Sequence, residues 1–116
     1  MRDLFLLIAG VLAILIAVIH SVLGETKIFA RARIEPASVR LLIRLVWQIG
    51  SIFWAGAGVL LLAAPYMESD SARHWIVYVC AVMFGAAAIG NAWSSRGRHF
   101  GWMMLAGVVV FALLGR

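Results

Sequence analysis

The sequence predicts an all-α fold: a polytopic membrane protein built as an antiparallel bundle of four transmembrane helices. The first reason is composition, because hydrophobic residues make up 65% of the 116 residues and charged residues only 13%. A soluble domain is roughly half apolar and about a quarter charged, and a chain of this length cannot bury so much apolar surface in water. The second reason is that all charged side chains lie between or outside four apolar runs. These observations exclude an ordinary soluble enzyme, a disordered chain and a disulfide scaffold, and the length allows a single domain, 1–116.

The four apolar runs have the lengths of membrane spans. A helix that crosses the hydrocarbon core needs about 20 apolar residues, and the first run is too long for the apolar core of a typical signal peptide. The fourth run has 16 residues, about 24 Å of helix, so the bilayer is expected to thin locally around it. Short connections make successive helices antiparallel neighbours. The predicted spans are about 4–23, 45–64, 74–93 and 100–115.

Proline and capping residues mark the expected ends of these helices. Pro65 stops the second span, and its helix is expected to begin at Pro36 because proline is favoured at the first helical position. Asp70 or Ser71 is the expected N-cap of the third helix. Small residues spaced three and four apart predict close contacts of the first three helices. These residues are Gly10, Ala13, Ala17, Ser51, Ala55, Gly58, Ala81, Gly85, Ala88 and Ala92.

The placement of charge predicts the orientation. Lys and Arg are enriched in cytoplasmic loops, and seven of the ten cations lie in the connections 24–44 and 94–99. The other three, Arg2, Arg73 and Arg116, lie on the opposite side. We therefore expect both termini outside and these two connections in the cytoplasm, with a bacterial inner membrane as the simplest location. Topology thus accounts for the net charge of +5, and no nucleic-acid partner is expected.

The segment 25–40 is expected to form a basic cytoplasmic loop on the membrane surface. Apolar Ile28, Phe29 and Ile34 alternate with cations in this segment, which suits a chain lying on the lipid bilayer. Anionic lipid head groups attract such a segment by about 1 kcal/mol per cation. The predicted lipid-contacting residues are Lys27, Arg31, Arg33 and Arg40.

Polar side chains gather toward one end of all four predicted helices. The span middles are nearly bare, with no polar side chain from Leu4 to Ile19. Polar residues inside a membrane are costly and are therefore candidates for function. The antiparallel order brings their ends to the same, cytoplasmic side, where we expect a polar layer that binds a ligand. Its members are His20, Glu25, Arg44, Gln48 and Asn91.

Besides an acid–base pair of His20 and Glu25 that would act on a lipid head group, three interpretations of this polar layer stay open. In the first it is structural, and each hydrogen bond between helices contributes about 0.6 kcal/mol. In the second Arg44 holds an anionic group and His20 acts as a proton-linked partner. In the third it holds haem or a metal, with His20 and His99 as ligands, and Glu25 would complete a three-ligand zinc site. No His-x-x-x-His or Glu-x-x-His spacing supports this third interpretation.

The sequence favours a non-catalytic role. It has no Ser–His–Asp order, no paired carboxylates and no glycine-rich phosphate loop. We expect a small integral inner-membrane protein that acts as a binding or accessory component. One alternative is a homo-oligomeric transporter or channel, which needs a polar path through the bare midplane; the other is a haem- or metal-binding membrane protein. The small residues also favour a homo-oligomer or a larger membrane complex.

Overall fold

The computed structural model describes all residues 1–116, and every regular element in it is helical. The four main helices are α1 (Arg2–Leu23), α3 (Ala37–Ala63), α4 (Asp70–Ser95) and α5 (Gly101–Leu114). A π-helix (Gly24–Ile28) and α2 (Phe29–Arg31) continue α1, and a 3-10 turn (Ala64–Tyr66) continues α3. The predicted all-helical class and the four helices are confirmed.

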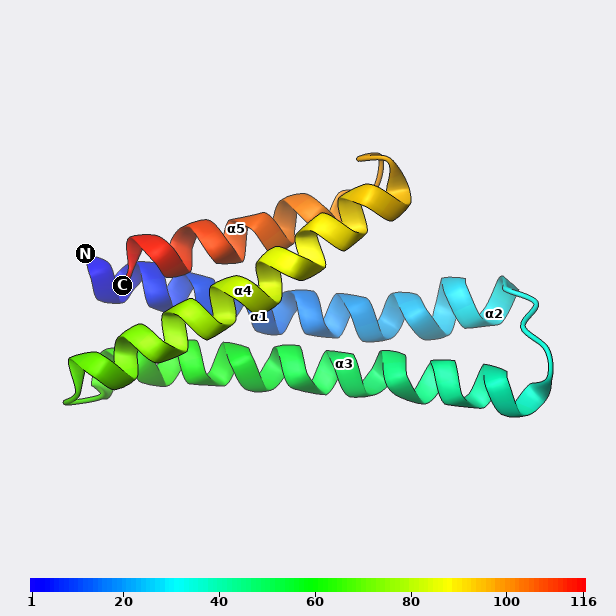
Figure 1. Ribbon diagram of the computed structural model, residues 1–116, viewed down its shortest axis with the longest axis horizontal. Coiled ribbons are helices and arrows are strands. Elements are labelled where there is room, and N and C mark those ends of the chain that lie inside the picture. Colours follow the sequence, from blue (N-terminus) through cyan, green and yellow to red (C-terminus); the bar gives the residue numbers. More distant parts are fainter.

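Three of these helices are long and apolar enough to cross a membrane: α1 with its extension, α3 with its 3-10 turn, and α4. The shorter α5 is also apolar. Successive main helices run in opposite directions, so both termini and the α3–α4 connection lie at one end of the molecule (Figure 1). We call this the terminal end. The α1–α3 and α4–α5 connections lie at the opposite end (Figure 1). We call this the basic end, because seven of the ten cations lie in 24–44 and 94–99.

The helices form two hairpins, α1–α3 and α4–α5, rather than an evenly packed bundle. α1 packs closely against both α3 and α5, whereas α3 and α4 touch very little. α4 starts beside α3 at the terminal end and crosses toward α5, so the α4–α5 hairpin lies apart from α3 at the basic end (Figure 1). Consequently the polar ends of the four helices do not meet in one layer, and a cleft lies between the two hairpins at this end.

Two glycines allow a close approach between the backbones of α1 and α3. A Cβ atom on Gly10 would lie 2.8 Å from the Gly58 carbonyl oxygen, and one on Gly58 would lie 2.9 Å from the Gly10 oxygen. Ala13 and Ala17 continue the buried stripe of α1, and Ser51 continues that of α3. The predicted close-packing stripes of the first two helices therefore lie in their interface, where small residues let backbones approach.

The helix ends differ from the sequence predictions at three places. Pro36 has an extended backbone and is the N-cap of α3, so the first helical residue is Ala37. Ser69 caps α4 instead of Asp70 or Ser71, because its hydroxyl accepts a hydrogen bond from the Ala72 N–H at 3.2 Å. The third difference is the segment 25–40, where helix continues from α1 as far as Arg31 and only 32–36 lies outside a helix.

Contacts with α3 explain why the chain remains helical as far as Arg31. Phe29 is buried and packs its ring edge against Trp47, with centroids 5.8 Å apart. Arg40 donates a hydrogen bond to the Phe29 carbonyl oxygen. Gly24 permits the approach, since a Cβ there would overlap the Trp47 indole. Side-chain packing across the hairpin thus keeps 24–31 helical, although the alternating pattern of apolar and basic residues predicts a surface loop there.

Arg73 closes the terminal end, a role that sequence reasoning missed. Its guanidinium pairs with Asp3 of α1 at 2.7 Å and donates to the Gly115 carbonyl oxygen at 2.8 and 3.2 Å. The residue is only 8% exposed. One side chain of α4 therefore ties the start of α1 to the end of α5, opposite the open basic end.

Candidate functional site: a cleft at the basic end

An ion pair and an amide join α1 to α3 at the outer edge of the basic end. Arg44 donates to both carboxylate oxygens of Glu25, at 2.9 and 2.7 Å. Gln48 donates to Glu25 at 2.9 Å and accepts from the Ser21 hydroxyl at 2.6 Å. Both charges of the pair are thus matched, and both side chains remain partly exposed, 49% for Arg44 and 37% for Glu25.

His20 lies one helical turn farther into the protein and is held by α3 on two sides. Its Nδ1 is 2.6 Å from the Ser51 hydroxyl. Its ring stacks on Trp47 with centroids 4.0 Å apart and planes 5° apart, and Trp54 approaches it to 4.5 Å. The Trp47 indole N–H donates to the His20 carbonyl oxygen at 2.8 Å. These contacts fix the imidazole as part of an aromatic wall.

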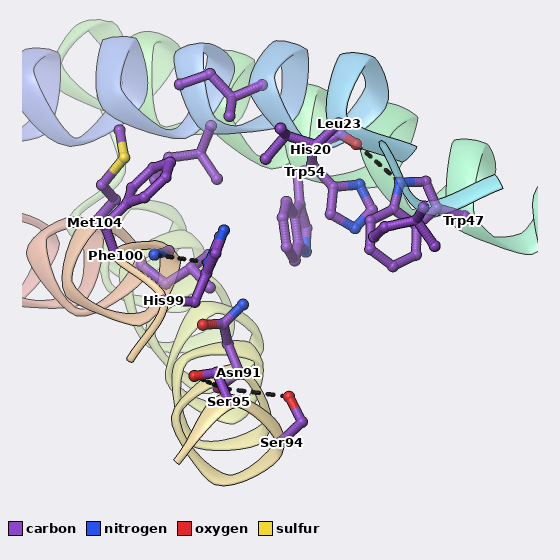
Figure 2. A pocket seen from close by; sticks show the side chains of 15 residues that line it. His20, Leu23, Trp47, Trp54, Asn91, Ser94, Ser95, His99, Phe100 and Met104 are labelled. Atoms are coloured by element: carbon purple, nitrogen blue, oxygen red, sulfur yellow. Dashed lines mark hydrogen bonds between the residues drawn. The ribbon is translucent and has the colours of Figure 1, made fainter. Parts of the chain in front are cut away.

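A cleft of about 380 Å³ separates this wall from the α4–α5 hairpin. Its polar side chains on the far side come from the end of α4 and from the α4–α5 connection, and its apolar lining includes Ile16, Met104 and Leu105. Figure 2 shows His20, Trp47 and Trp54 on one side and Asn91, Ser94, Ser95 and His99 on the other. No Asp, Glu, Lys or Arg lines the cleft. A concave, mostly apolar site with a few polar groups is typical of small-molecule binding.

The polar groups on the far wall differ in how well they are satisfied. Ser94 and Ser95 donate to the Asn91 carbonyl oxygen at 3.2 and 2.7 Å. His99 Nδ1 accepts a hydrogen bond from the Gly101 N–H at 3.1 Å. The Oδ1 atom of Asn91 is buried and has no hydrogen-bond partner. A buried acceptor without a donor costs about 1–3 kcal/mol, and because Oδ1 has almost no accessible surface, that cost stays within the protein and is not relieved by a molecule in the cleft.

The arrangement does not resemble a metal centre. No group of three or more His, Cys, Asp and Glu side chains lies close enough to hold a metal ion. The three-ligand zinc site of His20, Glu25 and His99 therefore does not form. His20 and His99 do line the same cleft, but the Nδ1 lone pair of His99 is used by Gly101. In a neutral imidazole the proton then lies on Nε2, which makes that nitrogen a donor and not a metal ligand.

The structure divides the residues of the predicted polar layer into two groups. His20 and Asn91 line the cleft, whereas the group of Glu25, Arg44 and Gln48 lies outside it and is bonded within itself. Among the predicted lipid-contacting cations, Arg40 is engaged within the protein, because it donates a hydrogen bond to the Phe29 carbonyl oxygen. The other three, which are exposed, are Lys27, Arg31 and Arg33.

The aromatic wall was not predicted as part of the site. By sequence, Trp47 fits an interfacial aromatic belt and Trp54 fits helix packing. The available signal was the spacing of Trp47, Ser51 and Trp54, four and three residues apart, which places them on one face of α3. The spacing alone does not reveal that the two indoles, Trp47 and Trp54, pack against the His20 ring.

Replacing Glu25 with Gln tests whether the outer group is structural. We expect only a small loss in the free energy of unfolding, because a solvent-exposed ion pair contributes little to stability. Binding in the cleft should not change. Glu35→Gln is the matched control, since its pair with Arg33 is far more exposed. A large effect of Glu25→Gln on cleft binding, measured as below, would contradict the division into two groups.

Comparison with known proteins adds no family to this description. No protein-family model matches the chain, and neither does any curated protein or solved structure. The function is therefore inferred from the cleft and from the surface that surrounds it.

Proposed function

We propose that this is a small integral membrane protein that binds a lipid-soluble molecule in the cleft between its two helical hairpins. The observation that carries the proposal is the lining of the cleft, which joins aromatic and aliphatic walls to hydrogen-bonding groups and includes no charged side chain. A ligand with an apolar body and a small polar head group fits such a site. This is a binding or accessory role without catalysis.

The exposed surface supports placement in a membrane. Large apolar side chains of α1 and α4 point outward, including Val11 (60% exposed), Val82 (72%) and Ile89 (68%). Trp75 and Trp93 are also exposed, 69% and 84%. They lie 18 residues apart on α4, about 27 Å along the helix, close to the roughly 30 Å of a hydrocarbon core. Tryptophans at that separation form an aromatic belt at both interfaces.

The proposed orientation places the basic end in the cytoplasm and both termini outside. Seven cations lie at that end and three at the other, as the positive-inside rule requires. The cleft then opens near the inner leaflet, and the exposed cations beside it meet anionic lipid. An impermeant thiol reagent applied from outside should label Glu68→Cys and not Thr26→Cys, both in a Cys80→Ser background. The reverse labelling would overturn the orientation.

A binding role is favoured over transport because the polar groups stay at one end. The cleft is lined from α1 by Ile16, Ile19, His20 and Leu23, all in the half of that helix nearest the basic end. The opposite half of α1 offers no polar side chain between Leu4 and Ile16. A transport path needs polar lining across the whole membrane, whereas a binding site needs it only where the head group rests.

Quenching of tryptophan fluorescence tests the proposal directly. A background with Trp75, Trp93 and Trp102 changed to Phe leaves only Trp47 and Trp54, which both line the cleft. In lipid nanodiscs, brominated undecyl compounds should quench these two indoles saturably. Ser94→Phe, which partly fills the cleft, should reduce the saturable part several-fold, and Ser38→Phe on an exposed site of α3 should not. Linear, non-saturable quenching that is equal in all variants would overturn the proposal.

A further inference from the structure

The Asn91 side chain presents its amide nitrogen, and not its oxygen, to the cleft. Asn91 Oδ1 and Arg40 Nη1 are the two buried side-chain atoms that lack a partner, so the Asn91 nitrogen, which makes no hydrogen bond within the protein, keeps accessible surface. A Cβ on Gly101, a residue that lines the cleft, would lie 3.1 Å from this nitrogen. Figure 2 shows the nitrogen directed toward the space below Trp54. A molecule in the cleft therefore meets an N–H donor at Asn91.

The neighbouring His99 ring explains why the amide is turned this way. The same Cβ on Gly101 would lie 2.8 Å from His99 Nδ1, so the Asn91 amide nitrogen and this ring nitrogen lie close together. His99 Nδ1 is an acceptor, because the Gly101 N–H donates to it at 3.1 Å. An amide hydrogen is attracted to such an atom and an amide oxygen is repelled. In the neutral ring the proton then lies on Nε2, and both unpaired nitrogens of the far wall are donors.

Trp54 adds a donor from the opposite wall. Its indole packs against His20 and Phe84, with centroids 4.5 and 6.0 Å away, but its N–H makes no hydrogen bond and is not buried. An indole nitrogen is a donor only, and an enclosed tryptophan usually has a partner for it. The serine hydroxyls of the far wall, in contrast, already donate to the Asn91 carbonyl oxygen. Free N–H groups therefore reach the cleft from both walls.

Asn91 also lowers stability in a way that a leucine of similar size would not. Its buried oxygen lacks a donor, which is unfavourable, and its side chain makes no hydrogen bond to another helix. Local choices that oppose stability are expected where a residue serves a function. The group that Asn91 provides is the amide N–H in the cleft.

The cleft supplies its donors without a positive charge. Arg96 and Arg98 are exposed in the α4–α5 connection and do not line the cleft, and Arg44 is bonded to Glu25 outside it. An anion would lose its water here and gain no counter-charge, which is strongly unfavourable. An uncharged acceptor, such as a carbonyl oxygen, has no such penalty.

We propose that the cleft selects an uncharged, lipid-soluble carbonyl compound whose carbonyl oxygen accepts a hydrogen bond from the Asn91 amide. The second lone pair of that oxygen is free to accept from His99 or Trp54, and the apolar body lies against the aliphatic lining. This inference rests on the proposed binding function and names the ligand class of the same site. It departs from the sequence-based expectation of an anionic ligand held by Arg44, because that guanidinium is occupied by Glu25.

Four probes that share one apolar body test this selection: methyl 11-bromoundecanoate, 11-bromo-1-undecanol, 11-bromoundecane-1-sulfonate and 1-bromoundecane. Each is titrated into nanodiscs holding the protein with only Trp47 and Trp54 retained, at pH 8, where imidazole side chains are mostly neutral. Membrane partition of each probe is measured separately, so that affinities refer to its concentration in the lipid. The ester should bind about tenfold more tightly than the alkane and the sulfonate, as expected for one or two added hydrogen bonds. The alcohol should bind more weakly than the ester, because its own hydroxyl hydrogen must also find an acceptor.

The carbonyl stretch of the ester reports the hydrogen bond directly. A carbon-13 label at the ester carbonyl separates its infrared band from those of the lipid esters, and hydrogen bonding lowers its frequency. Asn91→Leu should return the band to its position in protein-free nanodiscs and bring ester binding to within about twofold of alkane binding, which stays unchanged. Because it removes a buried unpaired oxygen, this variant is expected to fold, and circular dichroism checks it. Ser94→Ala is the matched control, since the Ser94 hydroxyl on the same wall already donates to the Asn91 carbonyl oxygen.

A double variant, Trp54→Phe with His99→Phe, keeps Asn91 and removes the other two donors. Trp47 remains as the reporter, because it also lines the cleft. This variant should still bind the ester at least about threefold more tightly than the alkane, as expected for one remaining hydrogen bond. Loss of the preference here, together with its survival in Asn91→Leu, would overturn the role of Asn91.

The outcomes separate this inference from the function on which it rests. Sulfonate binding as tight as that of the ester would overturn the uncharged ligand while leaving a binding cleft. Equal affinities of ester and alkane, or tighter binding of the alcohol than of the ester, would overturn the carbonyl. Failure of all four probes to quench saturably would overturn the proposed function itself. A decyl-substituted benzoquinone, titrated beside the ester, identifies the source of the carbonyl, since the tighter of the two assigns it to a ring ketone or to an acyl ester.

Discussion

Gly58→Val is expected to lower the free energy of unfolding by about 3 kcal/mol, the upper part of the range for overpacked interiors. Even the first added carbon would lie 2.9 Å from the Gly10 carbonyl oxygen and 2.7 Å from Ile14 Cγ1. The oxygen belongs to the backbone of α1 and cannot move unless the helix moves. The substitution therefore forces α1 away from α3 where their two backbones meet. Thermal unfolding in detergent, followed by circular dichroism, measures the loss.

Gly56→Ala is the matched control for this prediction. Gly56 lies on the same helix two residues away, and a Cβ there would meet nothing within 4 Å. Alanine is favoured over glycine in a helix by about 1 kcal/mol, so this variant should be as stable as the parent or slightly more stable. Equal losses for both variants would show that α3 resists any change in this region and that the contact of Gly58 with Gly10 is not the cause.

The sequence predicts those parts of the fold that depend on a single local feature, such as an apolar run, a proline or a stripe of small residues. Four apolar runs separated by charged segments determine four helices, and Pro65 ends α3 because proline lacks an amide hydrogen. The stripe of Gly10, Ala13 and Ala17 indicates the face of α1 that packs against α3. In each case a property of neighbouring residues is sufficient, and no knowledge of distant contacts is required.

The sequence could not determine how the two hairpins sit against each other. An antiparallel order says only that His20, Asn91 and His99 share an end of the molecule, and it says nothing about the angle at which α4 crosses α3. That angle separates the far wall from the near one and creates the cleft. The pairing of Arg44 with Glu25 is also undetermined by spacing, since the two residues are 19 positions apart and a turn lies between them.

Arg73→Met is expected to destabilise the protein by about 2–3 kcal/mol, and Asp3→Asn by no more than about 1 kcal/mol. Removing Arg73 breaks its pair with Asp3 and also leaves the Gly115 carbonyl oxygen without its bonds at 2.8 and 3.2 Å. An unsatisfied buried acceptor has a cost of its own. Removing the Asp3 charge affects a side chain that is 62% exposed, where water replaces the lost partner and ion pairs contribute little.

The asymmetry between these two variants tests how the terminal end is held together. If Arg73 acts mainly through the Gly115 carbonyl oxygen, the double variant should be little less stable than Arg73→Met, because Asp3 has already lost its partner. Urea or dodecyl sulfate titrations of the four proteins give the coupling energy. Equal costs for the single variants would instead assign the stability to the ion pair.

A second consequence concerns the cleft, since Arg73 joins the two hairpins at the end opposite to it. With that tie removed, the α4–α5 hairpin is free to rock against α1, and the distance between His99 and the aromatic wall should vary. Quenching of Trp47 and Trp54 by 11-bromo-1-undecanol should then lose its saturable part in Arg73→Met although no cleft residue has changed. Unaltered quenching would mean that the contact of α1 with α5 alone sets the width of the cleft.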